Sequence, residues 1–204
     1  MDRLRIALGV VRGPDGVAWI ERGTPPSLGR WALPGGRIEP GEEPLAAARR
    51  EVREETLLEV TGGEPLAMLV ERFEDAAGAH RYDVEVHAFL FADPGGEPVA
   101  ADGVTAAVRA PAPPSPALEP DRRLAALPGG DAQRIAARVR ADGDDLVVLA
   151  WEAQLARTRF CPSCGAPLGS FFGHQGDDGA VWCERCEEWS DAETGDADRQ
   201  PPDA

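Results

Sequence analysis

Six segments before residue 110 are rich in residues that favour β-strands. We predict strands at Arg5–Val11, Val17–Glu21, Trp31–Leu33, Ala67–Phe73, Tyr82–Phe91 and Gly103–Val108. Turn residues at Gly13–Gly16 separate the first two segments, and Asp75–Ala79 separates the fourth from the fifth. Each of these pairs is therefore expected to form a hairpin, and together the strands predict a sheet.

Between the third and fourth predicted strands the apolar spacing changes to that of a helix. Leu45, Ala48 and Val52 recur at helical intervals and should pack against the sheet. The preceding Glu42-Glu43-Pro44 suits a first helical turn, where negative charge is favoured and the missing proline N–H costs nothing. The sequence also predicts three later helices, at Leu118–Leu127, Asp131–Arg140 and Asp144–Arg157.

These elements divide the chain into four parts. Residues 1–116 form an α/β domain with a mixed sheet, which extends to about residue 128 if Leu118–Leu127 belongs to it. The Pro-rich stretch 110–116 is interpreted as an extended linker. A helical connector at 117–158 then leads to a cysteine-containing module at 159–190, and the acidic tail 191–204 is expected to be disordered.

The charge and hydropathy of the chain restrict its partners. The formal net charge is −15, which argues against nucleic acid as a partner because phosphate binding requires an excess of Lys and Arg. No apolar run approaches 18 residues and no apolar leader is present, so we expect a cytoplasmic protein without membrane contact. The excess of Asp and Glu is compatible with a high-salt cytoplasm.

The predicted helix at 45–56 carries an unusual acidic set. Glu51, Glu54 and Glu55 stand at i, i+3 and i+4, so their carboxylates share one face, where like charges destabilise an isolated helix. A cation between them would remove that repulsion, and oxygen-only ligands suit Mg²⁺ or Mn²⁺. The alternative is an ordinary solvated acidic face.

The surrounding residues favour the metal site. Read together, they give Trp31-Ala32-Leu33-Pro34-Gly35, then Gly36, Glu42, Arg50-Glu51-Val52-Arg53-Glu54-Glu55 and Leu57-Leu58. This pattern resembles the Nudix box, except that Leu57 stands where the family has Gly. The resemblance implies an α/β/α sandwich, a divalent metal held by Glu51, Glu54 and Glu55 with the Gly36 carbonyl as a further ligand, and an ion pair between Glu42 and Arg50. Because a left-handed conformation is costly for Leu, we expect the helix end to be rebuilt, running on towards Gly62-Gly63.

The resemblance also implies hydrolysis of the pyrophosphate bond in a nucleoside diphosphate derivative. Glu54 or Glu55 would act as general base, with Arg50 among the catalytic residues. Arg37, Arg53 and Arg81 are candidate phosphate contacts, and the alternative for each is a solvated surface arginine.

Glu71, Asp83 and Asp102 are further candidate bases, each of which also fits a solvated strand end. We expect ADP-ribose as the substrate, then a nucleoside triphosphate, then NADH. The rival interpretation is a catalytically silent Nudix-derived module that binds nucleotides or regulates a partner.

All four cysteines of the chain lie near its C-terminus. Cys161, Cys164, Cys183 and Cys186 form a CxxC-x18-CxxC pattern, which predicts a closed, structural zinc site, with two disulfides as the alternative. The stretch Trp151–Gly165 resembles the entry to the zinc ribbon of bacterial NADH pyrophosphatases, although there the ribbon precedes the Nudix domain. Such a ribbon would brace the catalytic domain or a homodimer.

Overall fold

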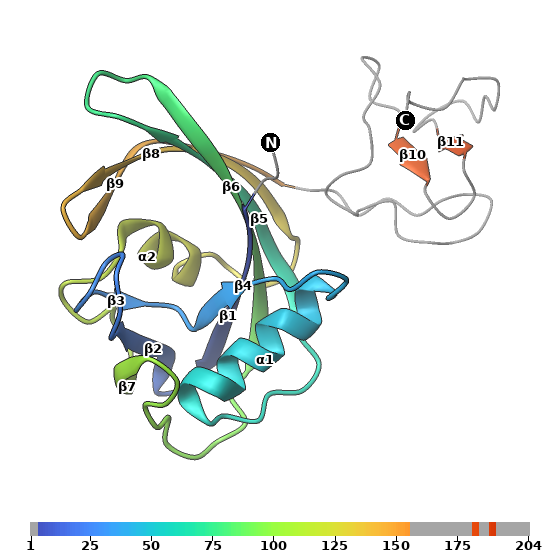
Figure 1. Ribbon diagram of the computed structural model, residues 1–204. Coiled ribbons are helices and arrows are strands. Elements are labelled where there is room, and N and C mark those ends of the chain that lie inside the picture. The colour runs from blue at the N-terminus through green and yellow to red at the C-terminus, as the bar shows by residue number, and fades with distance from the viewer. Residues whose placement is uncertain (1–3, 156–180, 184–187, 191–204) are drawn as a thin grey trace. The chain divides into compact units, whose positions relative to one another are not determined.

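The computed structural model describes residues 4–155, 181–183 and 188–190 (Figure 1). Contacts between residues divide the chain into two compact units, Met1–Gln154 and Leu155–Ala204. The first unit contains every residue of the Nudix-like segment, and it is described first.

A curled, mixed sheet forms the frame of this unit (Figure 1). Its strands are β1 (Leu4–Gly13), β2 (Gly16–Arg22), β3 (Trp31–Ala32), β4 (Gly35–Arg37), β5 (Glu64–Glu74), β6 (His80–Ala92), β7 (Val104–Ala110), β8 (Gln133–Asp142) and β9 (Asp145–Leu155). The order along the sheet is β3-β2-β1-β6-β5-β8-β9, with β4 paired to β1 and β7 paired to β2. Strand β1 runs parallel to β6, and β5 parallel to β8, whereas the β1–β2, β5–β6 and β2–β7 pairs are antiparallel. The predicted mixed sheet and all six predicted strands are confirmed.

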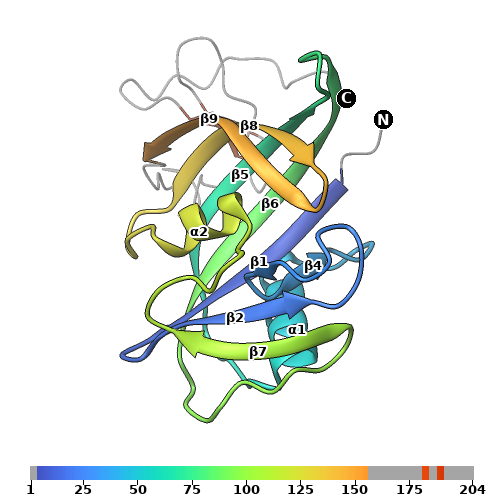
Figure 2. The same cartoon turned by 90° about the vertical axis from the view of Figure 1, so that its left-hand side faces the viewer.

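Two helices contact separate hydrophobic cores. Helix α1 (Pro44–Thr56) buries Ala47, Ala48 and Val52 in one core with residues of β1 and β6. Helix α2 (Glu119–Ala125) buries Leu124 in a second core with residues of β5 and β8. Figure 2 shows α2 beside the curve made by β5, β8 and β9, while α1 lies next to β1 and β4. Both helices agree with the sequence prediction.

The predicted helices at 131–140 and 144–157 are wrong, because the structure has strand β8 over Gln133–Asp142 and strand β9 over Asp145–Leu155 instead. In β8 the buried residues Ile135, Ala137 and Val139 alternate with exposed neighbours, which is the period of a strand with one buried face. The segment is rich in Ala and Arg, which favour helices, and this composition led to the wrong prediction of a helix. The β8–β9 turn uses Gly143, whose φ is +62°.

The described part of 117–158, which ends at residue 155, is therefore not a helical connector, and 110–116 is not a linker between domains. The Trp31 amide donates to the Pro116 carbonyl (2.8 Å), and the Leu118 amide donates to the Trp31 carbonyl (2.9 Å). The Pro-rich segment thus ends against β3, and the chain continues into the core through Leu118.

Helix α1 ends at Thr56, and the expected extension towards Gly62-Gly63 is wrong. Leu57 follows with φ 57° and ψ 13°, and its amide donates to the Arg53 carbonyl (2.9 Å). This is the left-handed C-cap that glycine usually supplies. The Leu57 side chain is 58% exposed, so the strain of this conformation is not offset by burial.

The second unit is described only in a short hairpin. Strand β10 (Val181–Cys183) pairs antiparallel with β11 (Glu188–Ser190). Cys161, Cys164 and Cys186 lie outside the described residues, as does the tail 191–204, so the zinc site and the disordered tail stay predictions.

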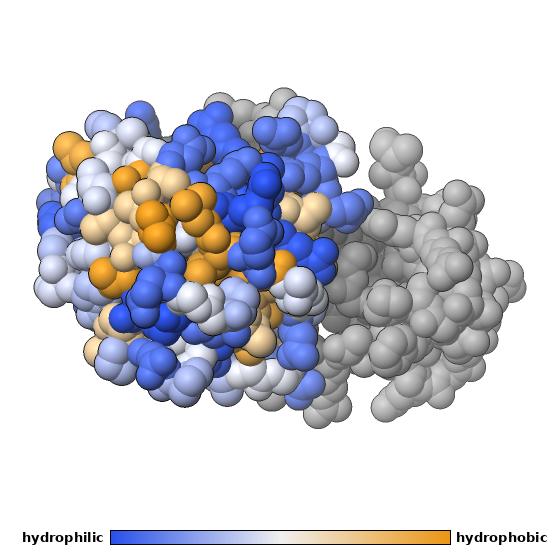
Figure 3. Space-filling model, turned by 90° about the horizontal axis from the view of Figure 1, so that it is seen from below, coloured by the Kyte–Doolittle hydropathy of each residue, from blue (hydrophilic) through white to orange (hydrophobic). Residues whose placement is uncertain are grey.

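One face of the described part of the chain carries both hydrophilic and apolar residues (Figure 3). Figure 3 shows one face, on which apolar residues gather in small areas bordered by hydrophilic ones. The large apolar side chains that are exposed are Leu28, Leu57, Tyr82, Val99 and Leu149. Among the described helices none is both long and apolar enough to cross a membrane.

We predict that Leu57→Gly raises the thermal stability of the protein. Glycine avoids the cost of the left-handed conformation, about 1–2 kcal/mol, and this gain exceeds its additional unfolded-state entropy, about 0.5–1 kcal/mol. Thermal unfolding measures the effect, and Glu59→Gly, two residues further on and also exposed, should lower the melting temperature. A decrease in both variants would contradict the explanation.

Candidate active site

Arg50 connects helix α1 to the loop that precedes it. Its guanidinium donates to both carboxylate oxygens of Glu42 (Nε to Oε1 and Nη2 to Oε2, each 2.9 Å). It also donates to Glu51 Oε1 (2.7 Å) and Glu54 Oε2 (3.1 Å), and Nη2 donates to the Arg37 carbonyl (3.0 Å). The ion pair between Glu42 and Arg50 that the resemblance implied is confirmed.

This network has opposite effects on the acids around it. The hydrogen bonds from Arg50 lower the pKa of Glu42 to about 2, so Glu42 remains ionised at neutral pH. Burial raises the pKa of Glu51 above its usual value, although Arg50 opposes this effect. The loop is therefore held by a firmly charged pair, while Glu51 keeps a charge that is costly to bury.

Two glycines bring the loop backbone against the acidic face of α1. The Gly35 amide donates to Glu55 Oε2 (2.8 Å). A Cβ atom added at Gly36 would lie only 2.5 Å from Glu51 Oε1. Glycine is thus required at residue 36 for the carboxylate to approach the backbone this closely.

The chemistry of the helix carboxylates fits a hard divalent cation. Burial raises the pKa of Glu55 to about 7, although the Gly35 amide and the charge of Arg22 oppose this effect, so a nearby cation would favour its ionised form. Glu51, Glu54 and Glu55 offer only oxygen donors, the type that Mg²⁺ and Mn²⁺ prefer. Within the described residues, however, no three acidic, His or Cys side chains are already grouped as a metal site, and the Arg50 guanidinium contacts both Glu51 and Glu54.

A cavity of about 570 Å³ opens beside these carboxylates. Residues of strands β1–β9, of both helices and of the loops between them line it. At one end lie Gly36, Arg37, Glu51 and Glu55 from the loop and helix. Elsewhere the walls are mainly apolar, so the cavity combines a charged end with a hydrophobic interior, as ligand sites often do.

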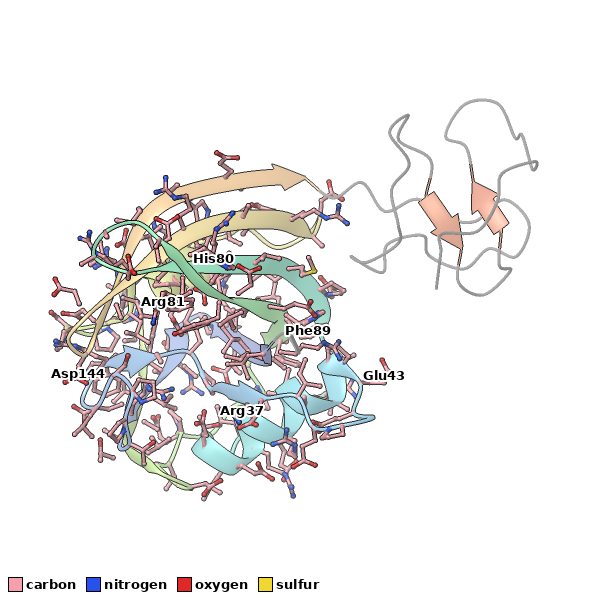
Figure 4. All side chains as sticks on the ribbon, turned by 45° about the horizontal axis from the view of Figure 1, so that its top comes forward. Arg37, Glu43, His80, Arg81, Phe89 and Asp144 are labelled. Atoms are coloured by element: carbon pink, nitrogen blue, oxygen red, sulfur yellow. The ribbon has the colours of Figure 1, made fainter. Side chains whose placement is uncertain are left out.

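The three arginines predicted to contact phosphate lie in different places. Arg37 lines the cavity, beside α1, whereas Arg81 lies with His80 at the β5–β6 hairpin (Figure 4). Arg81 is largely exposed and 3.9 Å from Asp75, and the exposed Arg53 is 4.0 Å from Glu54; neither is among the cavity-lining residues. Sequence reasoning missed Arg22, which lines the cavity and whose charge lowers the pKa of Glu55.

The three further candidate bases, Glu71, Asp83 and Asp102, lie in different environments. Glu71 is not a solvated strand end, because it is only 6% exposed and lies in the middle of β5. Asp102 lines the cavity, whereas Asp83 is paired with His80 at 2.9 Å and does not line it. Burial raises the pKa of Glu71 to about 8, and the charge of Asp121 adds to this effect.

Asp121 was also missed by the sequence analysis. It lies in the first turn of α2, where the negative charge of an acidic residue normally interacts favourably with the helix dipole. Here its Oδ1 accepts the Leu33 amide (2.8 Å), and the side chain lines the cavity. No sequence signal marks this contact, because residues 33 and 121 meet only when α2 folds against β3.

Comparison with known proteins agrees with the geometry. The family model of the NUDIX domain matches residues 2–125, more than half of the chain. The chain belongs to the Nudix family. The match ends after α2, so strands β8 and β9, with the part of the cavity wall that they supply, lie beyond it.

Individual relatives of this Nudix protein are distant. A putative 8-oxo-dGTP diphosphatase 2 from Mycobacterium tuberculosis is 44% identical over 61 residues, which are 29% of this chain and 43% of the relative. A MutT protein from Bacillus halodurans has a similar fold (TM-score 0.58, 20% identity, 74% of this chain and 97% of that one). A MutT Nudix hydrolase from Burkholderia pseudomallei also has a similar fold, with a TM-score of 0.51 and 22% identity. The match covers 61% of this chain and 97% of that one.

We predict that the Nudix domain loses stability as pH rises from about 5 to 8, and that Glu71→Gln reduces this loss. A carboxyl whose folded-state pKa is raised binds its proton more tightly in the folded protein than in the unfolded chain. Its contribution is therefore present below the unfolded pKa of about 4.5 and is lost as pH rises to about 8. Glutamine cannot ionise, so this contribution disappears.

Thermal unfolding at pH 5 and pH 8 in metal-free buffer measures the difference. Glu64→Gln, an exposed change at the start of the same strand, is the matched control and should behave as wild type. A melting-temperature difference between the two pH values that is unchanged in Glu71→Gln would show that Glu71 ionises normally in the fold.

Proposed function

We propose that this protein hydrolyses the pyrophosphate bond of a nucleoside diphosphate derivative with the help of Mg²⁺ or Mn²⁺. The observation that carries the proposal is the position of Glu51 and Glu55, which line one end of the large cavity and whose pKa values are raised by burial. A nucleotide has two unlike parts, and the cavity has a charged end and an apolar interior to receive them.

Glu51, Glu54 and Glu55 would hold the divalent cation. When bound, the cation supplies charge that offsets the pyrophosphate and lowers the pKa of an attacking water. Arg50 donates to Glu51 and Glu54 and fixes the loop through Glu42, so its role would be to position these two ligands.

Two arginines at the cavity are suited to phosphate oxygens. Arg37 is exposed at the charged end, and its backbone is held by Arg50. Arg22 donates through Nε to the Pro26 carbonyl (2.9 Å), and its charge acts on both Glu55 and Asp121. Arg53 and Arg81, which do not line the cavity, are less suited to this role.

Proton removal from the attacking water requires a base near the metal. Glu54 and Glu55 are the candidates on α1, and Asp102 is a third residue at the cavity wall. Glu55 has a pKa of about 7 without a cation, and a divalent cation would favour its ionised form. We favour Glu54 as the base because its carboxylate remains less buried and more accessible to water.

We place nucleoside triphosphates ahead of ADP-ribose as the substrate class, which reverses the order expected from the sequence. The reason is the match to a relative named as an 8-oxo-dGTP diphosphatase, although the chain spans less than half of that relative. NADH remains third.

Glu54→Gln is predicted to lower kcat by about 10²–10⁴-fold, the effect expected when a positioned proton acceptor is lost. The glutamine keeps the size of the side chain, so thermal stability should change little. Hydrolysis of a nucleotide panel, containing nucleoside triphosphates, ADP-ribose and NADH, is measured with Mg²⁺ and with Mn²⁺, and chelation should abolish it.

Glu43→Gln is the matched control, because Glu43 precedes α1 and is exposed to solvent (Figure 4). Its turnover should equal that of wild type. Undiminished hydrolysis by Glu54→Gln would remove Glu54 from the mechanism. Nucleotide binding without hydrolysis by the wild-type chain would favour the silent module instead.

A further inference from the structure

The two ends of the curled sheet come together beside the cavity. The strand order runs from β3 at one end to β9 at the other, yet Arg30, directly before β3, contacts Asp145, the first residue of β9. Arg30 Nε lies 2.8 Å from Asp145 Oδ1. Figure 2 shows the β8–β9 turn beside the loop that precedes β3. We call the junction between residues 23–30 and residues 141–146 the seam.

Both sides of the seam belong to the cavity wall. The residues of the seam that line the cavity are Thr24, Pro26 and Ser27 on one side and Ala141, Gly143 and Leu146 on the other. The hairpin side lies beyond residues 2–125, the part of the chain that matches the family model. A separation of the two sides would therefore open the cavity to solvent along the seam.

Side chains, rather than strand pairing, hold the seam closed. In the described part of the chain β9 pairs with β8 and β3 pairs with β2, and no strand pair joins β3 to β9. Further along β9, the Val148 amide donates to Glu119 Oε2 of α2 (3.1 Å). Across the seam itself the described residues form one polar contact, the ion pair of Arg30 and Asp145. The turn end of the hairpin is thus held less firmly than the rest of β9.

The ion pair is of a kind that can open. The Asp145 side chain is 47% exposed and that of Arg30 is 26% exposed, so water competes for both charges. The Arg30 Nε atom is buried, yet its N–H is not aligned for a hydrogen bond with Asp145 or with any other described group. A buried donor without a hydrogen bond destabilises the closed arrangement. The attraction between two partly hydrated charges therefore has to keep the seam closed.

We propose that the seam is a gate for the ligand of the cavity, and that the pair of Arg30 and Asp145 is the latch that keeps the gate closed. When the gate opens, the β8–β9 turn moves away from the loop before β3, while the contact of Val148 with Glu119 holds the rest of β9. Neither latch residue lines the cavity, so the pair controls passage without binding the ligand. The inference rests on the proposed function in that it takes the cavity to be the nucleotide site.

A gate has a kinetic signature that a ligand-binding residue lacks. Loss of the latch raises the open population of the free protein and of the complex alike. The association and dissociation rate constants then rise by the same factor, and Kd is unchanged. The loss of a residue that contacts the ligand changes mainly the dissociation rate constant.

The test is stopped-flow binding of a mant-labelled α,β-methylene analogue of GTP to the full chain in the presence of Mg²⁺. Asp145→Asn and Arg30→Gln should each raise both rate constants by about two- to fivefold, the range for a partly exposed ion pair, with Kd unchanged. Asp144→Asn removes the same charge from the neighbouring exposed residue and should behave as wild type (Figure 4). The double variant with Arg30→Asp and Asp145→Arg should return both constants towards wild type.

Two results would overturn the gate. One is a pair of rate constants in Asp145→Asn that equal those of wild type. The other is a rise in the dissociation rate constant alone, which would show that the ion pair supports the shape of the cavity and not the passage of its ligand.

A second probe separates this result from failure of the proposed function. If the nucleotide analogue does not bind to wild type, the proposed function fails, and the same comparison is made with the apolar dye anilinonaphthalene sulfonate. Equal acceleration of both dye rate constants by Asp145→Asn, without an effect of Asp144→Asn, still supports the gate. Identical dye kinetics in all variants refute it.

Discussion

The hydrogen bonds of Arg50 are the constraint on which the candidate site depends. One guanidinium joins Glu42 and the Arg37 carbonyl in the loop to Glu51 and Glu54 on the helix. A planar group with five donors can do this, whereas a lysine ammonium cannot reproduce the bidentate contact with Glu42. Glu51 is partly buried, and the charges of neighbouring acids repel its own charge. The contacts with Arg50 reduce this repulsion on the acidic face of α1 when no cation is bound.

The curled sheet gives the cavity two chemically different regions. Helix α1 packs on one core and contributes Glu51 and Glu55 to the cavity lining, while α2 packs on the other core and contributes the buried Asp121 to the same lining as Glu71 of β5. Both regions contain carboxyls whose pKa is raised by burial. The two sets of carboxyls lie on separate elements of the fold, the first on α1 and the second on β5 and α2.

Local sequence patterns predicted the strands and the box helix, because each depends on residues close in the chain, whereas the Arg50–Glu42 pair was implied by the resemblance to the Nudix box. They failed for β8 and β9, where Ala and Arg favour a helix and only pairing of Ile135 with Leu69 on β5 selects the strand. They failed at Leu57, which adopts the left-handed conformation between the buried residues Thr56 and Leu58. Arg22 and Asp121 line the site because residues far apart in the sequence come together in the fold. Their positions in the sequence could not predict this.

The central claim is that the box carboxylates of α1 hold a divalent cation at the charged end of the cavity. The most direct measurement is the anomalous scattering of Mn²⁺ in crystals of the full chain, with Glu51→Gln as the comparison. We expect an anomalous peak within coordination distance of Glu51, Glu54 or Glu55 in wild type, and a weaker peak or none in the variant. No peak at these residues in wild type, with Mn²⁺ present in excess, would contradict the claim.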